Sequence, residues 1–261
     1  MWYTVGAAAL GGPPFVRNGM YFVWGGAARA PPPTKWTEGD PMKTSKFLSV
    51  ILSVLIALVV LTGSIAVPLL CRSFYYAHIG PMGLEDWGMP REEIRRAYDE
   101  MMDFCLGKRA DFAAGALAFS QSGADHFTDV RGLFLLDLRV LKLSAAALGL
   151  LLGWCVVGKV RPHRFRSRGP GFWAAAGLGA SFLLVGGLAA LDFDRAFVIF
   201  HSVFFHGKDN WIFDWQTDPI ILFLPQDFFR NCALLILALL LLWCGVLIGS
   251  DLLAGKRGRR S

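Results

Sequence analysis

The chain has 261 residues, of which 54% are hydrophobic, and it carries a formal net charge of +6. The hydrophobic residues gather in long blocks, which excludes an ordinary water-soluble domain. The basic excess lies in short clusters beside those blocks, a pattern typical of membrane topology rather than of a nucleic-acid partner.

The first 41 residues differ in composition from the rest of the chain. They are rich in Gly, Ala and Pro and show neither a helical nor a strand period. We expect residues 1–41 to be a disordered extension or a mis-called upstream start, because Met42 is followed by two lysines and an apolar run, as at the start of many membrane proteins. A cleaved signal peptide is disfavoured because the first apolar run is too long for one.

Four apolar runs have the length of membrane spans, since a hydrocarbon core needs about 20 helical residues. The predicted spans cover approximately residues 47–70, 134–158, 171–192 and 230–250. The second run carries Asp137, Arg139 and Lys142 near its start, and we place these at the membrane interface. The predicted fold class is an all-α membrane protein, with a four-helix domain over residues 42–255 and a basic tail at 256–261.

Lysine and arginine indicate the orientation of the spans, since basic residues concentrate on the cytoplasmic side. They cluster before the first span, between the second and third spans, and after the fourth, and these places share one side of the membrane. The loop between the second and third spans holds five basic residues and no acid: Lys159, Arg161, Arg164, Arg166 and Arg168. We therefore expect both termini to be cytoplasmic and the long helical loops at 71–132 and 192–228 to be extracytoplasmic.

The first long loop opens with polar and aromatic residues that suit a membrane interface. Arg72 could hold a phosphate or carboxylate, although Arg72 and Tyr75 are more simply explained as interfacial anchors. Residues 91–106 carry apolar residues at three- and four-residue steps, which predicts an amphipathic helix. Cys71 and Cys105 both lie in this loop and could pair, but sequence does not decide it.

A second helix of this loop is predicted to begin near Ser122, with Asp125 in the usual glutamate position of a capping box. His126 lies in its first turn. Asp129 follows on the same face, within reach of the His126 ring, and could orient that ring and raise its basicity. The helix is expected to run on into the second span.

The third span is predicted to continue past Leu191 as one helix, which would place Asp194 on the face of His201, two turns later. Several phenylalanines surround His201 in the sequence, and they could form a wall for an acyl chain or ordinary packing. A turn at residues 207–211 and a short re-entrant or interfacial helix from Asp218 are expected before the fourth span.

His126 and His201 both fall at the predicted extracytoplasmic face. Three interpretations fit the pair: proton-transfer catalysis, a metal site completed by Asp129, Asp194 or Asp209, and purely structural histidines. A metal site is disfavoured because no two histidines are spaced four residues apart and no third ligand is obvious. The sequence also contains no nucleotide-binding or serine-hydrolase motif.

Several short motifs occur in a consistent order between residues 43 and 250. They are Arg72-x-Phe74-Tyr75-Tyr76, Ala97-Tyr98-Asp99-Glu100-Met101, His126-Phe127-x-Asp129-Val130-Arg131, Phe200-His201-x-x-Phe204-Phe205, Asp209-Asn210-Trp211-x-Phe213 and Leu224-Pro225-x-x-Phe228-Phe229. Each motif is modest alone, but the ordered set resembles the lipoprotein intramolecular transacylase family. Residues 1–41 lie outside the resemblance.

The resemblance implies a bacterial four-span enzyme of the cytoplasmic membrane that acts on diacylglyceryl lipoproteins. Such an enzyme moves the sn-2 acyl chain from a glycerol oxygen to the α-amino group of the N-terminal cysteine, and the product is a lyso-form lipoprotein. The two family histidines fall on His126 and His201. The implied partners are the lipoprotein substrate and membrane lipid, with no nucleic acid.

The chemistry of the residues fits this reaction. A neutral histidine can take the proton of the attacking amine, and a histidine can supply one to the leaving oxygen, so no cofactor, metal or Ser/Cys nucleophile is required. The candidates for orienting groups or stabilising the oxyanion are Asp129, Arg131, Arg72, Tyr75, Asp194, Asp209, Asn210 and Trp211. The roles of the two histidines stay open. Two other functions also stay open. One is a non-catalytic lipid- or peptide-binding scaffold; the other is a small transporter, and only the transporter is disfavoured by the small number of charges within the spans.

Overall fold

The structure is a computed structural model that describes residues 44–257. The predicted extension at 1–41 and residues 258–261 of the predicted tail lie outside the described residues. The four longest helices are α1 (Lys46–Leu70), α4 (Gln121–Val157), α5 (Pro170–Leu191) and α7 (Gln226–Arg257). All four are long and apolar enough to cross a membrane. The predicted all-α class with four spans is confirmed.

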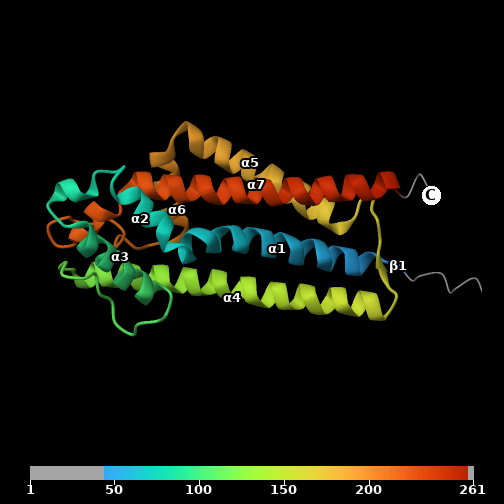
Figure 1. Cartoon of the computed structure of the whole chain (residues 1–261), viewed down its shortest axis with the longest axis horizontal. Helices are drawn as coiled ribbons and strands as arrows, with labels where there is room; N and C mark the ends of the chain where they lie inside the picture. The colour runs from blue at the N-terminus through green and yellow to red at the C-terminus, as the bar shows by residue number, and fades with distance from the viewer. Residues whose placement is uncertain (1–43, 258–261) are drawn as a thin grey trace, which may run out of the picture. The chain divides into compact units, whose positions relative to one another are not determined.

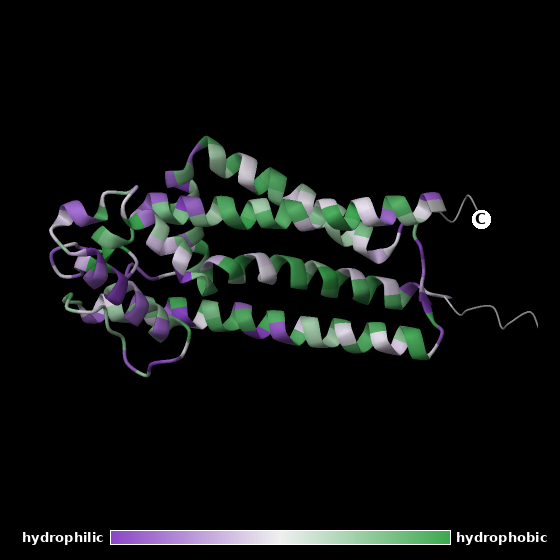
Figure 2. Ribbon diagram, viewed as in Figure 1, coloured by the Kyte–Doolittle hydropathy of each residue, from purple (hydrophilic) through white to green (hydrophobic). Residues whose placement is uncertain are grey.

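Helix α1 contacts α4, α5 and α7, and α5 also packs against α7 (Figure 1). Hydrophobic residues predominate along most of the length of these helices (Figure 2). Many of those side chains are exposed, among them Leu150, Val156, Leu188 and Leu253. A helix that is apolar on its outer face fits a lipid environment, where water does not contact that face.

Helix α4 begins at Gln121 and continues through the predicted second span, as expected for the helix predicted to begin near Ser122. Its 37 residues reach about 55 Å, whereas a hydrocarbon core is about 30 Å thick. The polar stretch at 121–133, which contains Asp129 and Arg131, therefore lies outside the membrane-spanning part of the helix.

The N-cap of α4 is Ser120 and not Ser122. The Ser120 hydroxyl accepts a hydrogen bond from the backbone N–H of Gly123 at 3.0 Å. The predicted capping box is wrong because Ser122 already lies inside the helix. Asp125 instead accepts a hydrogen bond from the side chain of Gln121.

The third span does not continue past Leu191 as one helix, so this prediction is also wrong. Asp192 adopts an extended backbone conformation (φ −156°, ψ 91°) and caps a new helix, α6 (Phe193–Phe204), by accepting a hydrogen bond from the Arg195 N–H at 2.9 Å. The chain bends at this point (Figure 1). An N-cap carboxylate stabilises the start of a helix, which explains why two helices replace one.

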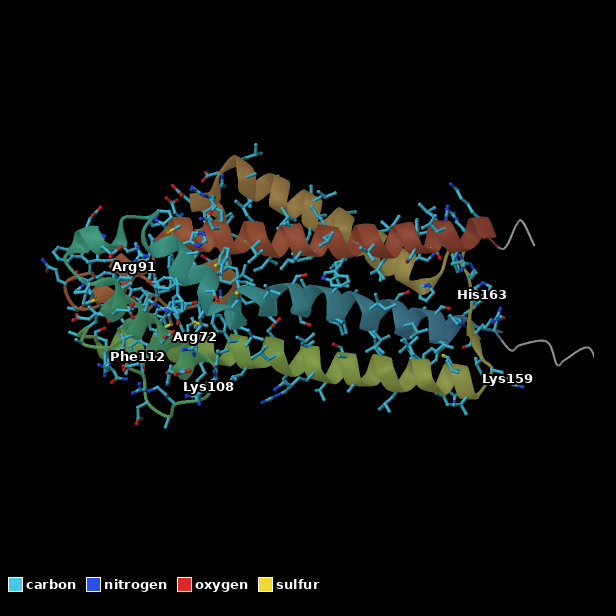
Figure 3. The ribbon with its side chains drawn as sticks, in the orientation of Figure 1. Arg72, Arg91, Lys108, Phe112, Lys159 and His163 are labelled. Carbon is cyan, nitrogen blue, oxygen red and sulfur yellow. The ribbon has the colours of Figure 1, made fainter. Side chains whose placement is uncertain are left out.

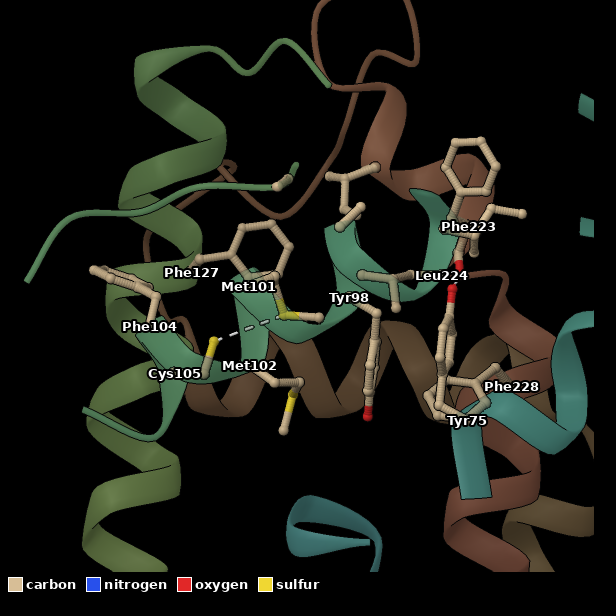
Figure 4. Packing of buried hydrophobic residues seen from close by; sticks show 14 of the residues in the cluster. Tyr75, Tyr98, Met101, Met102, Phe104, Cys105, Phe127, Phe223, Leu224 and Phe228 are labelled. Atoms are coloured by element: carbon tan, nitrogen blue, oxygen red, sulfur yellow. Dashed lines mark hydrogen bonds between the residues drawn. The ribbon is translucent and has the colours of Figure 1, made fainter. Parts of the chain in front are cut away.

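The end of the bundle that carries His126 and His201 is called the histidine end below. Four short elements pack there: α2 (Arg72–Ile79), η1 (Leu84–Trp87), α3 (Arg91–Cys105) and η2 (Pro219–Phe223). Their apolar side chains share one core, in which Tyr75 stacks on Tyr98 with ring centroids 3.7 Å apart (Figure 4). Helix α3 is the amphipathic helix expected over 91–106, and its apolar face is buried in this core. The short helix expected from Asp218 is η2.

Cys71 and Cys105 do not form a disulfide. Cys71 is exposed, whereas Cys105 is fully buried in α3. Burial raises the pKa of the Cys105 thiol to about 12, so this thiol is protonated and unreactive at neutral pH.

The opposite end of the bundle, called the basic end below, holds the start of α1, the loop at 158–169 and the end of α7. A short parallel pairing of β1 (Thr44–Ser45) with β2 (Arg161–Pro162) joins this loop to the start of α1. Asp251 of α7 pairs with Arg164 at 2.9 Å and accepts a hydrogen bond from the Gly169 N–H at 2.9 Å. The loop at 158–169 is therefore attached both to the start of α1 and to the end of α7.

Candidate active site

Two histidines from different helices meet at the histidine end. His126 comes from α4 and His201 from α6, and their ring centroids lie 6.1 Å apart with the rings 26° from parallel. Both residues are buried, with 6% and 8% of their surface exposed. Side chains crowd this end of the molecule around the labelled Arg72 and Phe112 (Figure 3). The structure thus brings the two predicted histidines together.

Aromatic rings enclose the histidine pair. His126 lies against Phe205 and Phe213, with ring centroids at 4.8 and 5.3 Å. His201 stacks on Trp211 with centroids 4.7 Å apart. These rings give the pair an apolar environment, in which charged imidazole is disfavoured.

The backbone fixes the tautomer of His201. Its Nδ1 lies 2.8 Å from the carbonyl oxygen of Phe197, which can only accept a hydrogen bond, so Nδ1 carries a proton. In the neutral ring, Nε2 is then able to accept a proton. Nδ1 of His126, in contrast, is buried and has no hydrogen-bond partner within residues 44–257.

Burial lowers the pKa of both histidines, which lie outside the membrane-spanning segments. For His126, burial and then the proximity of His201 lower the pKa to about 4, against the smaller opposing effects of Asp129 and Asn210. For His201, burial lowers the pKa, and the hydrogen bond to Phe197 offsets only part of this effect. Both rings are therefore neutral at pH 7 and able to accept protons.

Asp129 lies near the pair but forms no hydrogen bond to either ring among the described residues. Its two carboxylate oxygens accept hydrogen bonds from Lys208 Nζ at 2.6 Å and from Asn210 Nδ2 at 3.1 Å. Burial acts to raise the pKa of Asp129, but these two partners lower it by more, and the carboxylate stays ionised. The expected direct contact with the His126 ring is absent because Lys208 and Asn210 occupy the carboxylate.

Asn210 lies between Asp129 and His126. Its amide nitrogen is held by Asp129, and its side chain raises the pKa of His126. No hydrogen bond of normal geometry joins Asn210 to His126, however, since Oδ1 of Asn210 and Nδ1 of His126 are both buried and unpaired within the described chain. Unpaired buried polar atoms are rare and often mark functional sites, so these two atoms keep unused hydrogen-bonding capacity.

Three residues predicted as possible oxyanion donors are occupied elsewhere. Arg72 forms ion pairs with two aspartates of α3. Tyr75 is buried and donates its hydroxyl hydrogen to an η2 carbonyl at 2.7 Å. Arg131 donates to a backbone carbonyl of the loop after α3 at 2.9 Å. These side chains hold α2, α3, α4 and η2 together, and none contacts the histidine pair.

Of the other predicted candidates, Trp211 contacts the histidine pair directly, whereas Asp194 and Asp209 do not. Asp194 accepts a hydrogen bond from Gln226 at 2.8 Å, and it lies about 10 Å along α6 from His201, too far for direct contact. Asp209 contributes its backbone carbonyl to a turn. Trp211 stacks on His201 while its indole N–H donates to the backbone of that turn at 3.2 Å.

Two further residues hold the site and were not predicted. Lys208 neutralises Asp129. Asp218, with 4% of its surface exposed, accepts a hydrogen bond from the Ser120 N–H at 2.8 Å and packs against Gly123 at the start of α4. This contact joins residues 98 positions apart, so local sequence patterns give no sign of it.

An open apolar pocket lies beside the histidine end, at the end of α1 that adjoins α2, with a volume of about 410 Å³. It is lined by Gly63, Ala66, Val67, Leu70 and Cys71. Such walls suit a hydrocarbon chain. No three His, Cys, Asp or Glu side chains between residues 44 and 257 are grouped so that they could hold a metal ion.

The chain is similar to known proteins in sequence and in fold. A family model described as "Lipoprotein intramolecular transacylase Lit" matches residues 50–229. The fold is similar to an in meso structure of the membrane integral lipoprotein intramolecular transacylase Lit from Bacillus cereus, with a TM-score of 0.72 and 23% identity over 82% of this chain and 97% of that chain. A structure of the same protein with a histidine-to-alanine mutation gives a TM-score of 0.68 and 22% identity, over 82% and 95% of the two chains. No curated protein sequence matches the chain.

Proposed function

Since the chain belongs to the lipoprotein intramolecular transacylase family, it is a membrane acyltransferase, and we propose that it moves an acyl chain within diacylglyceryl lipoproteins. The acyl chain leaves the sn-2 oxygen of glycerol. The acceptor is the α-amino group of the N-terminal cysteine that carries the diacylglyceryl group. The product is N-acyl, S-monoacylglyceryl lipoprotein, the lyso form.

The first step is attack of the amine on the ester carbonyl carbon. A free α-amine has a pKa of about 8, so a neutral fraction is available near physiological pH. We assign His201 as the base, because the hydrogen bond to Phe197 leaves its Nε2 as the acceptor and its lowered pKa keeps the ring neutral. As the N–C bond forms, one amine proton passes to this nitrogen.

The second step is loss of the glycerol oxygen from the tetrahedral intermediate. The C–O bond breaks, and the oxygen takes a proton from the histidine pair. We propose that the proton taken up by His201 passes to His126 and from His126 to the oxygen, because a pKa of about 4 makes protonated His126 a strong acid. Both rings are then neutral again. One N–H bond is lost and one O–H bond is formed, so the reaction needs no cofactor and no external nucleophile.

Asp129, Lys208 and Asn210 act on the reacting groups by position and charge. Asn210 is oriented by Asp129 and keeps a buried, unpaired carbonyl oxygen beside His126. This oxygen can accept a hydrogen bond from the substrate amine and so place it for attack. The Lys208 ammonium pairs with the other carboxylate oxygen of Asp129 and so fixes the carboxylate that orients Asn210.

The histidine end is proposed to face the outside of a bacterial cytoplasmic membrane. The basic loop at 159–168 lies at the opposite end of the bundle, and basic residues favour the cytoplasm. Both termini are then cytoplasmic. The apolar pocket beside α1 is proposed to hold the acyl chain while it is transferred.

The observation that supports this proposal most strongly is the buried pair of neutral histidines. The test is to express the full chain in bacteria that make diacylglyceryl lipoproteins but do not N-acylate them. Substrate and product are isomers, so tandem mass spectrometry must locate the acyl chain on nitrogen in the N-terminal lipopeptide. We expect N-acylation with the natural chain and with the exposed-site control His206→Ala, and none with His126→Ala or His201→Ala. Failure of the natural chain to N-acylate would overturn the proposed reaction. Undiminished transfer in both variants at equal protein levels would overturn the histidine assignment.

A further inference from the structure

A groove of about 340 Å³ lies at the basic end, at the opposite end of the bundle from the histidine pair (Figure 3). One side of it is apolar and aromatic, formed by Val50, Val54, Phe165 and Trp173. Lys46 and His163 also line it. The groove therefore combines a hydrocarbon-like wall with two nitrogen-bearing side chains.

Hydrogen bonds hold the walls of the groove in place. The Ser49 hydroxyl of α1 donates to the His163 carbonyl at 2.8 Å, and the Ser53 hydroxyl donates to the Pro170 carbonyl at 3.1 Å. The Trp173 indole N–H donates to the loop backbone at 3.2 Å. These bonds join α1, the loop and the start of α5, so the groove is preformed.

Among residues 44–257, the positive charge at this end exceeds the negative charge that could balance it. Between residues 143 and 191 the sequence has five basic residues and no acid. Asp251 is already shared by Arg164 and Arg168. Lys46, at the mouth of the groove, forms no ion pair within residues 44–257. An anionic group is thus the complementary occupant.

We propose that this groove binds one anionic phospholipid from the adjoining membrane leaflet. The phosphate lies at Lys46 and the ring of His163, where charge-assisted hydrogen bonds stabilise it. The upper part of one acyl chain follows Val50 and Val54 towards Trp173. An amphiphile uses both halves of the groove, whereas a soluble phosphate uses only one. The bound lipid braces α1 against α5, and its site is independent of the acyl-transfer site.

Native mass spectrometry of the purified full chain tests the proposal. The protein is released from bilayers that contain equal amounts of phosphatidylglycerol and phosphatidylcholine, and the lipid that stays bound is identified. We expect phosphatidylglycerol to be retained preferentially. Val54→Trp fills the apolar part without changing charge, and Lys46→Gln removes the phosphate partner. Lys46→Gln should reduce the preference about five-fold, the contribution of one basic residue near an anionic surface. Val54→Trp should reduce the amount of phosphatidylglycerol retained and, with it, the preference. Lys159→Gln removes the same charge from the neighbouring loop without touching the groove and should leave the preference unchanged.

Three results would overturn the proposal. One is equal retention of the two lipids by the natural chain. Another is an unchanged preference in both Val54→Trp and Lys46→Gln, which would indicate a diffuse basic surface. The third is binding of glycerol 3-phosphate with the same affinity as the lipid, which would indicate a simple anion site. Lys46 is exposed, so its variant is expected to fold, and circular dichroism checks this. None of these outcomes depends on acyl transfer.

Discussion

His126 and His201 lie with their ring centroids 6.1 Å apart inside a wall of aromatic side chains. At this distance a proton on one ring lowers the pKa of the other, as the effect of His201 on His126 shows. The pair therefore carries no positive charge at rest, and it accepts one additional proton more readily than two. A site of this kind suits a reaction that takes one proton from an amine and gives one to an alkoxide.

Low pH should destabilise the protein through His126. Its pKa is about 4 in the folded protein against 6.5 for an ordinary histidine, so the unfolded chain binds more protons between these values. The stabilisation is complete above pH 6.5 and is lost as the pH falls toward 4, by about 3 kcal/mol. Thermal unfolding between pH 4 and pH 8 should show this slope in the natural chain and in His206→Gln. An equally steep slope in His126→Gln would contradict burial of a neutral ring.

Gly123→Ala should disturb the start of α4. A Cβ there would lie 2.9 Å from Cγ of Asp218 and 3.2 Å from the ring of Phe213, which packs on His126. We expect a loss of about 1–3 kcal/mol in the free energy of unfolding, with slower acyl transfer. Gly132→Ala is the matched control, because nothing lies within 4 Å of its Cβ and alanine favours the helix. Equal melting temperatures for the two variants would rule out the close contact.

Asp129→Asn should slow acyl transfer by about 10-fold to 100-fold, because Asn210 and Lys208 lose the charge that positions them. The same change should lower the pKa of His126 further, since Asp129 raises it. The acid limb of the pH–rate profile should then move to lower pH. Asp125→Asn, exposed one turn earlier on α4, is the control. A profile that does not move in Asp129→Asn would contradict the electrostatic role.

Arg72→Gln should lower stability rather than remove catalysis. Arg72 pairs with Asp99 and Asp103 and joins α2 to α3, and its loss removes one ion pair from each of these carboxylates. We expect the melting temperature to fall by several degrees, from a loss of about 1–3 kcal/mol. The rate of transfer by the folded protein should be nearly unchanged. Arg91→Gln breaks an exposed pair and should have little effect. A large fall in the rate of acyl transfer at unchanged stability would instead indicate that Arg72 acts in the active site.

The fold class could be predicted because four long apolar runs have few alternatives in a bilayer. The convergence of His126 and His201 followed from topology, which confines both of their loops to one face. Helix boundaries were less predictable. Asp192 is compatible with a helix interior and with an N-cap, and only the packing of α6 decides between them.

Long-range partners could not be predicted from spacing. Arg72 was interpreted as an interfacial anchor or an anion-binding residue, because Asp99 and Asp103, its ion-pair partners, lie 27 and 31 positions away in the sequence. Asp129 looked like the partner of His126 because both share a helix face. The loop after α6 supplies Lys208 and Asn210 from about 80 positions away, and these groups bind that carboxylate instead.

The most direct test of proton transfer by the histidine pair is a rate measurement. It would follow oxygen-to-nitrogen acyl transfer on a synthetic diacylglyceryl-cysteinyl peptide, with the purified full chain in micelles. Tandem mass spectrometry would follow the position of the acyl chain over time. We expect His126→Gln and His201→Gln each to be slower by about 100-fold or more at an unchanged fold, and His206→Gln to match the natural chain. A rate within a few-fold of the natural chain in either of the first two variants would show that the paired imidazoles do not carry the proton transfer.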